Sequence, residues 1–169
     1  HYLKSFFKKT DSNCDSYSLS DEDEILNKSI ADIFCSKGCV THCTFCHRFN
    51  KGIRIVPPDI VISRIRELIK RFNVGVIFFS DECFGASIKW LCEFCKLIKP
   101  LNLLWRVNGM RVKGVSPDII KMMKDAGCRS IIYGMETGSE KMLQVMEKKV
   151  SLEDNYNAVR WIVEAGLYT

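Results

Sequence analysis

Short apolar runs alternate with longer amphipathic stretches from residue 30 to the end of the chain. Four runs rich in Val, Ile, Phe and Tyr have the composition of buried strands. The stretches between them repeat apolar residues every three or four positions, which is the period of helices with one buried face. The sequence therefore predicts alternating strands and helices, with strands at residues 31–36, 74–80, 103–108 and 129–135.

Residues typical of helix caps mark the ends of the predicted helices. Ser116 followed by Pro117 is a start signal, and Gly127 closes the same helix. Ser139 can cap a further helix, and Ser151 resembles the first residue of a capping box. Five helices are expected, within residues 57–72, 88–98, 116–127, 139–146 and 151–163.

Alternating strands and helices predict an α/β fold with a parallel sheet, either doubly wound or closing toward a (β/α) barrel. In both architectures ligands bind at the carboxyl ends of the strands. Unusual polar residues follow each predicted strand: a cysteine-rich loop, then Asp81 and Glu82, then Asn108 and Arg111, then residues 136–139. Four separate segments are therefore expected to meet at one rim.

The two ends of the chain differ from its middle. Residues 1–29 are rich in Ser, Asp, Asn and Glu without a sustained apolar period, which indicates a linker or the tail of a preceding domain. Residues 30–169 form the predicted core. Gly166 is expected to release the last helix toward a fifth strand, so the chain is interpreted as the incomplete, amino-terminal part of a larger core, with the edge of the fourth strand left unpaired.

Composition narrows the class of protein. Nine cysteines cannot all pair with one another, and no secretory segment opens the chain, so metal binding in the cytoplasm is favoured over a disulfide framework. No apolar run has the roughly 20 residues that span a bilayer, so no membrane partner is expected. The net charge of +5 is scattered over predicted helix faces, which makes nucleic-acid binding an unfavoured interpretation.

The stretch "CVTHCTFC" places Cys39, Cys43 and Cys46 in the spacing C-x3-C-x2-C. Thiolates are the ligands that iron–sulfur clusters use, and one loop with three of them can hold three corners of a cluster. The alternative is a zinc site completed by His42 or His47. Zinc would leave the other three rim segments unexplained.

Five other cysteines are interpreted as packing residues: Cys14, Cys35, Cys92, Cys95 and Cys128. Cys35 fits a buried strand position, and using it as a ligand would break the spacing of the motif. Cys92 and Cys95 have the spacing of a redox pair, but they lie in the middle of a predicted helix, with Cys95 on its apolar stripe.

The cysteine motif with Phe45, followed by "FSDECF", "WRVNGMR" and "YGMETGS", resembles the radical S-adenosylmethionine (SAM) superfamily over roughly residues 30–169. It is similar to the branch in which a cobalamin-binding domain precedes the radical SAM core. The resemblance implies a partial (β/α) barrel, here ending after the fourth β/α unit. It also implies a [4Fe-4S] cluster on Cys39, Cys43 and Cys46, whose fourth iron is chelated by the amino and carboxylate groups of SAM.

The resemblance further implies an activity. An electron from a donor such as flavodoxin or ferredoxin passes through the cluster and cleaves SAM to a 5′-deoxyadenosyl radical, which abstracts hydrogen from a substrate. A cobalamin-dependent methyltransferase or a related C–C or C–S bond-forming enzyme is one form of this activity, with cobalamin held by a domain outside this chain. The substrate is unknown. The competing hypothesis is a zinc-binding or RNA-binding interaction module built on the cysteine knuckle.

Two predicted SAM contacts come from the segment after the second strand. Asp81 and Glu82 stand where such families often have a Gly-Gly-Glu-like stretch that receives the SAM ammonium, although the two glycines are missing here. Glu82 is slightly favoured. The competing interpretation is an acidic turn at the start of the following helix.

Four more predicted SAM contacts follow the third and fourth strands. Arg111 can pair with the SAM carboxylate or a substrate phosphate, with Asn108 beside it. Glu136 can accept hydrogen bonds from ribose hydroxyls while Gly134 on the same face clears space for the ligand. Ser139 either adds a contact or caps the next helix.

Overall fold

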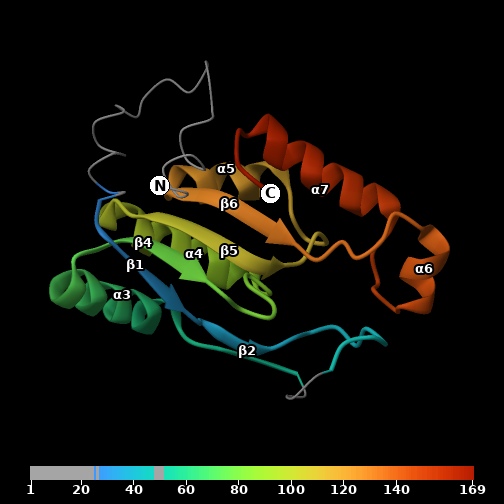
Figure 1. Cartoon of the computed structure of the whole chain (residues 1–169), viewed down its shortest axis with the longest axis horizontal. Coiled ribbons are helices and arrows are strands. Elements are labelled where there is room, and N and C mark those ends of the chain that lie inside the picture. The colour runs from blue at the N-terminus through green and yellow to red at the C-terminus, as the bar shows by residue number, and fades with distance from the viewer. Residues whose placement is uncertain (1–24, 26, 48–51) are drawn as a thin grey trace.

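A four-stranded parallel sheet forms the centre of the structure, a computed structural model that describes residues 25, 27–47 and 52–169 (Figure 1). Its strands lie in the order β1-β4-β5-β6, so each strand lies beside the next one along the chain. The parallel sheet predicted from the alternating pattern is confirmed. The strands are β1 (Ser29–Ile33), β4 (Val74–Phe79), β5 (Leu104–Met110) and β6 (Cys128–Tyr133).

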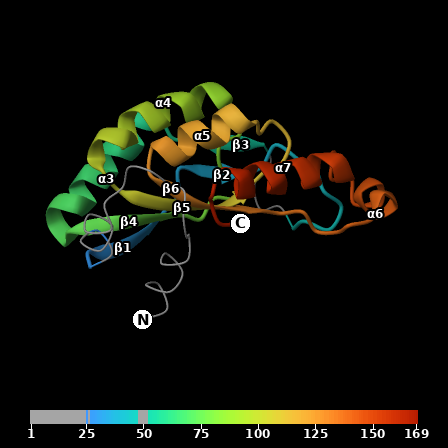
Figure 2. The same ribbon diagram turned by 90° about the horizontal axis from the view of Figure 1, so that it is seen from above.

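Helices cover one face of this sheet, as the view from above shows (Figure 2). The three predicted serine caps are confirmed, because the hydroxyl oxygens of Ser116, Ser139 and Ser151 each accept a hydrogen bond from a backbone N–H in the first turn of their helix. The helices are α3 (Pro58–Phe72), α4 (Ile88–Ile98) with a 3-10 turn η1 (Lys99–Leu101), α5 (Pro117–Asp125), α6 (Glu140–Val145) and α7 (Leu152–Glu164).

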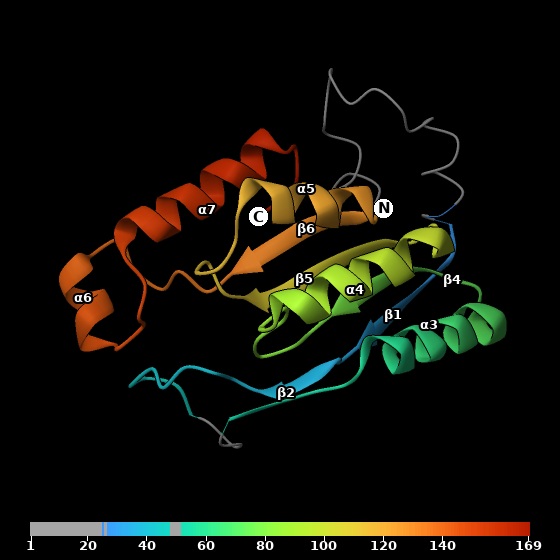
Figure 3. The ribbon, with the colours of Figure 1, turned by 180° about the vertical axis from the view of Figure 1, so that it is seen from behind.

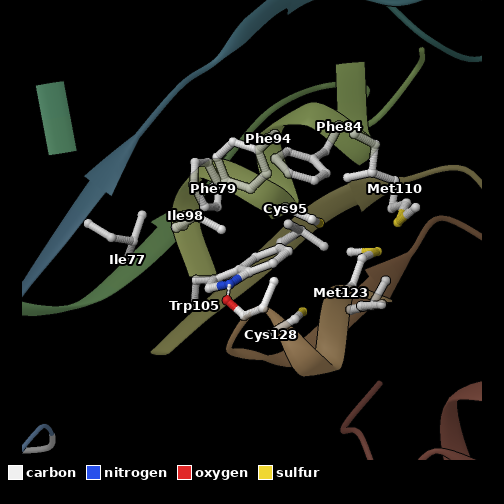
Figure 4. Close-up of a cluster of buried hydrophobic side chains, with 14 of the residues drawn as sticks. Ile77, Phe79, Phe84, Phe94, Cys95, Ile98, Trp105, Met110, Met123 and Cys128 are labelled. Atoms are coloured by element: carbon white, nitrogen blue, oxygen red, sulfur yellow. Dashed lines mark hydrogen bonds between the residues drawn. The ribbon is translucent and has the colours of Figure 1, made fainter. Parts of the chain in front are cut away.

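The main core lies between the sheet and these helices (Figure 4). Phe79 of β4 and Trp105 of β5 meet edge to face with ring centroids 5.8 Å apart, a geometry that aromatic pairs prefer. The indole N–H of Trp105 donates to the carbonyl oxygen of Ala126 at 2.7 Å, so its polar atom is satisfied inside the core. Cys95 is buried in the same cluster, which confirms its interpretation as a packing residue.

A small antiparallel hairpin was not predicted. The expected first strand, 31–36, is interrupted: β1 ends at Ile33, and β2 (Ser36–Gly38) pairs instead with β3 (Ile53–Ile55). The hairpin extends beyond the carboxyl end of β1, and the cysteine motif occupies the chain between its two strands (Figure 3). Two strands of three residues each are too short to show a period in the sequence.

Residues near both ends of the chain contact the sheet. The predicted linker, 1–29, lies almost entirely outside the described residues, but Ser29 opens β1 and Ile25 is buried against the sheet. Beyond α7, the N–H of Ile131 donates to the carbonyl oxygen of Tyr168 at 2.9 Å, and the N–H of Tyr168 donates to that of Arg129 at 3.0 Å. The chain therefore turns into a fifth parallel position, as Gly166 indicated. The prediction that this edge of β6 has no neighbour was wrong at Ile131.

Candidate functional site

The cysteine hairpin is fastened to the sheet by Asp81, which follows β4 and is 3% exposed. Its carboxylate accepts hydrogen bonds from the backbone N–H groups of Cys35, at 3.1 Å, and Ser36, and also from the Ser36 hydroxyl. Burial raises the pKa of the Asp81 carboxyl, and the bonds from Ser36 and Cys35 act against that rise. This arrangement favours a positioning role for Asp81 over the predicted contact with SAM. The neighbouring Glu82 is exposed, and its contact with SAM stays a prediction.

Cys39 is the most strongly activated thiol of the motif. A hydrogen bond from the Cys83 thiol lowers the pKa of Cys39 to about 5; Thr41 and the charge of Arg111 act in the same direction, and burial opposes them. The Cys39 sulfur lies 3.0 Å from the Thr41 hydroxyl oxygen. This lowered pKa favours the thiolate of Cys39, which is the form that binds metals.

Cys83 is a site residue that the sequence reasoning missed. It is 0% exposed and follows Glu82 in the loop after β4. Donation to Cys39 raises the pKa of Cys83 far above its ordinary range, and burial adds to the rise. The residue stands inside the quoted stretch "FSDECF", so its place after the second strand was a signal that it belongs to the rim.

The three motif thiols differ in exposure: Cys39 is half-buried, Cys43 is buried and Cys46 is exposed. In the described part of the chain, no three Cys, His, Asp or Glu side chains are gathered closely enough to hold a metal ion. The donor chemistry nevertheless suits an iron–sulfur cluster, because the motif supplies three soft sulfur ligands on one hairpin and the pKa of one of them is lowered.

The segment after β5 meets the cysteine hairpin. The positive charge of Arg111 lowers the pKa of both Cys39 and Cys83, so the guanidinium lies near the two thiols. Asn108 is half-buried, and its side-chain oxygen is buried without a hydrogen-bond partner among the described residues. The structure thus brings these two predicted residues to the rim. Contact of either residue with SAM stays a prediction.

Gly109 explains how closely this segment approaches the loop after β4. Its φ is +69°, a conformation that favours glycine, and a Cβ added there would collide with the carbonyl oxygen of Asp81. The N–H of Phe84 also donates to the carbonyl oxygen of Gly109 at 3.3 Å. The strand end and the Asp81 loop are therefore packed backbone to backbone, which fixes Asn108 and Arg111 relative to the cysteine hairpin.

Glu136 lies beyond the end of β6 in an ion pair. Its carboxylate oxygen is 2.7 Å from the Lys148 ammonium, and a Cβ added at Gly134 would lie 2.7 Å from the same oxygen. Gly134 therefore clears space for this ion pair, whereas the sequence reasoning assigned the space to a ligand. The Glu136 side chain is 33% exposed, which leaves it accessible from the rim.

The fourth segment also reaches the cysteine hairpin. The Lys148 ammonium lies 5.6 Å from the centre of the Phe45 ring, and the N–H of Thr44 donates to the carbonyl oxygen of Met146 at 2.9 Å. The hydroxyl oxygen of Ser139 accepts a hydrogen bond from the N–H of Met142 at 3.4 Å, so Ser139 caps α6, as one of its two interpretations predicted. Segments after all four strands of the sheet thus converge, as the sequence predicted.

Comparison with known proteins assigns a family to this arrangement. A family model described as the radical SAM superfamily matches residues 33–169. The chain belongs to this superfamily. Among the helices that the structure describes, none has the length and apolarity needed to cross a membrane.

Two curated relatives illustrate the similarity. The chain is 30% identical over 150 residues to the anaerobic magnesium-protoporphyrin IX monomethyl ester cyclase of Rubrivivax gelatinosus, covering 85% of this chain and 27% of that protein. It is 25% identical over 138 residues to the bacteriochlorophyllide d C-8(2)-methyltransferase of Chlorobaculum tepidum, covering 75% and 31%. The chain therefore spans less than a third of either relative.

Solved structures share the fold. The radical SAM methyltransferase TsrM of Kitasatospora setae, determined with cobalamin and a [4Fe-4S] cluster bound, aligns with a TM-score of 0.71 and 17% identity over 87% of this chain and 29% of its own. The cobalamin-dependent radical SAM enzyme OxsB, with aqua-cobalamin and SAM bound, aligns with a TM-score of 0.68 and 21% identity over 81% and 22%.

Proposed function

We propose that this protein is a radical SAM enzyme in which Cys39, Cys43 and Cys46 hold a [4Fe-4S] cluster. When bound, the cluster supplies the electron that cleaves SAM reductively. The observation that carries the proposal is the anchored hairpin: Asp81 fastens it to the rim, and Cys83, Thr41 and the charge of Arg111 lower the pKa of Cys39 there. Family membership over residues 33–169 agrees with it. Cluster binding requires the hairpin to draw its three sulfur atoms together.

The other rim residues have roles in holding SAM. Glu82 is exposed next to the hairpin and can accept hydrogen bonds from an ammonium group. Arg111 offers a planar set of donors to a carboxylate, and the free oxygen of Asn108 can accept a hydrogen bond. Glu136 can exchange or share its bond to Lys148 with ribose hydroxyls. Ser139 contributes by holding α6 in place.

A more specific form of the proposal is a cobalamin-dependent methyltransferase or a related enzyme that forms C–C or C–S bonds. The cobalamin bound in the TsrM and OxsB structures supports it. Cobalamin would be held by a domain outside this chain, and the core would be a partial (β/α) barrel of which these residues are the amino-terminal part. Flavodoxin or ferredoxin would supply electrons in the cytoplasm, where thiols stay reduced. The substrate is not assigned.

The direct test is anaerobic reconstitution of the full-length protein with iron and sulfide, followed by addition of SAM and a strong reductant. We expect 5′-deoxyadenosine to form slowly even without substrate. Replacing Cys39, Cys43 or Cys46 by Ala should abolish both the cluster and this product. Cys92→Ala, at a half-buried position of α4, is the matched control and should leave both intact. Loss of the cluster in that control would give α4 a part in metal binding.

Metal analysis of the same preparation distinguishes the proposed enzyme from the competing zinc-binding module. A zinc-binding module would contain stoichiometric zinc and no acid-labile sulfide, whereas the proposed enzyme contains iron and sulfide with a brown chromophore. Stoichiometric zinc in anaerobically purified protein, without iron, would overturn the proposal.

Glu136→Ala tests the assignment of one SAM contact. The variant should keep the cluster but bind SAM more weakly by about 1–3 kcal/mol, the usual cost of losing a hydrogen bond to a charged group. Lys148→Ala is the control for the ion pair, because it removes the partner of Glu136 but leaves the carboxylate available. Equal SAM affinity in the wild type and Glu136→Ala would remove Glu136 from the site.

A further inference from the structure

A row of four residues crosses the sheet, one from each strand. Asp32 of β1 lies opposite Phe78 of β4, Phe78 lies opposite Arg106 of β5, and Arg106 lies opposite Ser130 of β6. Residues directly opposite each other in neighbouring strands present their side chains to the same face. The row therefore places a carboxylate, an aromatic ring, a guanidinium and a hydroxyl side by side.

This row belongs to the face of the sheet that helices α3, α4, α5 and α7 leave uncovered; toward the amino ends of the strands, Ile25 packs on this face against Val76, Leu104 and Phe78. The chain neighbours of Arg106 are Trp105 and Val107, and both belong to the core beneath the helices. The same is true of Ile77 and Phe79 on either side of Phe78. Because successive side chains in a strand alternate between faces, Phe78 and Arg106 point away from the helices.

The Arg106 side chain has no partner for its charge among the described residues. Its guanidinium carbon lies 3.7 Å from the centre of the Phe78 ring, so one face of the group is covered by the aromatic ring. Its Nε is buried without a hydrogen-bond partner in the described part of the chain. A buried donor of this kind is destabilising when it stays unpaired.

The only acidic member of the row does not neutralise Arg106. Asp32 is exposed and accepts a hydrogen bond from the Ser80 hydroxyl at 2.9 Å. It lies two strands away from Arg106, roughly 10 Å at the usual spacing of strands, with the Phe78 ring between them. Stacking on Phe78 holds the Arg106 guanidinium in place. The N–H groups along the edge of the guanidinium can then donate to a further acceptor.

We propose that Arg106 binds an oxyanion of the substrate, a carboxylate or a phosphate group, on the uncovered face of the sheet. The proposal rests on the proposed function, because it takes the substrate to lie against this face. A planar guanidinium matches both oxyanions through paired hydrogen bonds. Arg106 lies four residues before Met110, the last residue of β5, roughly 13 Å below the rim at the usual rise of a strand. It is therefore separate from Arg111 at the rim.

The test measures oxyanion binding by the full-length, cluster-reconstituted protein. Inorganic phosphate is titrated and followed by the broadening of its 31P resonance, and glutarate is titrated and followed by saturation-transfer difference NMR. Arg106→Gln should weaken binding of the preferred probe about tenfold or more, as expected for a lost charged hydrogen bond. Arg160→Gln, an exposed arginine on α7, should bind as the wild type does. The probe that saturates the protein at the lower concentration identifies the preferred oxyanion as phosphate or carboxylate.

Three results would overturn the proposal. These are equal binding in the wild type and Arg106→Gln, an equal loss in Arg160→Gln, and no saturable binding of either probe to the wild type. If Arg106→Gln does not fold, Arg106→Lys decides, because it keeps the charge but not the paired donors: weaker binding supports the proposal and unchanged binding rejects it.

The same variants keep this proposal distinct from the proposed function. Iron content, SAM binding and 5′-deoxyadenosine formation without substrate should be unchanged in Arg106→Gln. Oxyanion binding that depends on Arg106, in a wild type that forms no 5′-deoxyadenosine, would reject the proposed function and retain the oxyanion site.

Discussion

At the scale of single residues, the neighbours of Cys39 favour its thiolate, the form that binds metals. Its pKa of about 5 comes first from the Cys83 thiol, which donates a hydrogen bond that stabilises the thiolate. Thr41 and Arg111 add to this effect from the hairpin and from the segment after β5. The side chains of three separate segments therefore determine the ionisation of one cysteine.

The ionisation of Cys39 can be measured in cluster-free protein by its rate of alkylation with iodoacetamide. Because the thiolate is the reactive form, the rate should be nearly constant above pH of about 6 and should fall as the pH drops through about 5. Cys83→Ala removes the main hydrogen-bond donor to Cys39, so the midpoint of the pH dependence of alkylation should move to higher pH. Peptide mass spectrometry assigns the label to Cys39. A midpoint that is unaffected by Cys83→Ala would show that this hydrogen bond does not control the thiol.

At the scale of elements, Asp81 joins the hairpin to the sheet. Asp81→Ala would leave the N–H groups of Cys35 and Ser36 without their acceptor in a buried place, which should lower the free energy of unfolding by about 1–3 kcal/mol. Urea denaturation measures this loss. Asp125→Ala is the control, because its ion pair with Lys121 is exposed and should contribute less than about 1 kcal/mol. Equal losses in the two variants would refute the proposed anchoring of the hairpin.

The sequence was informative wherever a local pattern determines structure. Caps such as Ser116 and the capping box of Ser151 with Asp154 involve residues three apart, so they could be read directly. The bonds of Asp81 to Cys35 and Ser36 join residues 46 and 45 positions apart, and no local pattern indicates them. The ion pair of Glu136 with Lys148 could not be predicted either, because the two residues are 12 positions apart with helix α6 between them.

Gly109, near the end of β5, allows a test of the close backbone contact between this strand and the loop after β4. Gly109 and Gly114 both have positive φ, +69° and +91°, so alanine at either position meets backbone strain of about 1–2 kcal/mol. Only Gly109 faces the Asp81 carbonyl oxygen, whereas a Cβ at Gly114 meets nothing within 4 Å. Gly109→Ala should therefore cost clearly more stability than Gly114→Ala, measured as the difference in urea midpoints. It should also lower iron retention, because the Asp81 loop supports the cysteine hairpin. Equal midpoints would mean that the close approach is unimportant.

At the scale of the whole molecule, the sheet has two unlike faces. One is sealed by α3, α4, α5 and α7 and contains the aromatic core. The other carries the row that includes Arg106 and Phe78, and alternation also places Ile30 and Ile132 on it, each 41% exposed. The rim residues converge at one end of this sheet, and the proposed oxyanion site takes the substrate to extend from there over the uncovered face. The proposals therefore assign a supporting role to the helix-covered face and a binding role to the other.

This asymmetry predicts how the 169-residue chain behaves by itself. Exposed apolar residues on the uncovered face should drive self-association at high concentration, because apolar surface removed from water is stabilising. Ile132→Lys should shift the chain toward monomer, measured by sedimentation velocity over a range of concentrations. Val163→Lys is the matched control, because Val163 is 63% exposed but lies on α7, on the opposite side of the sheet. If both substitutions act equally, or if the unmodified chain stays monomeric throughout, the uncovered face is not the surface through which this chain associates.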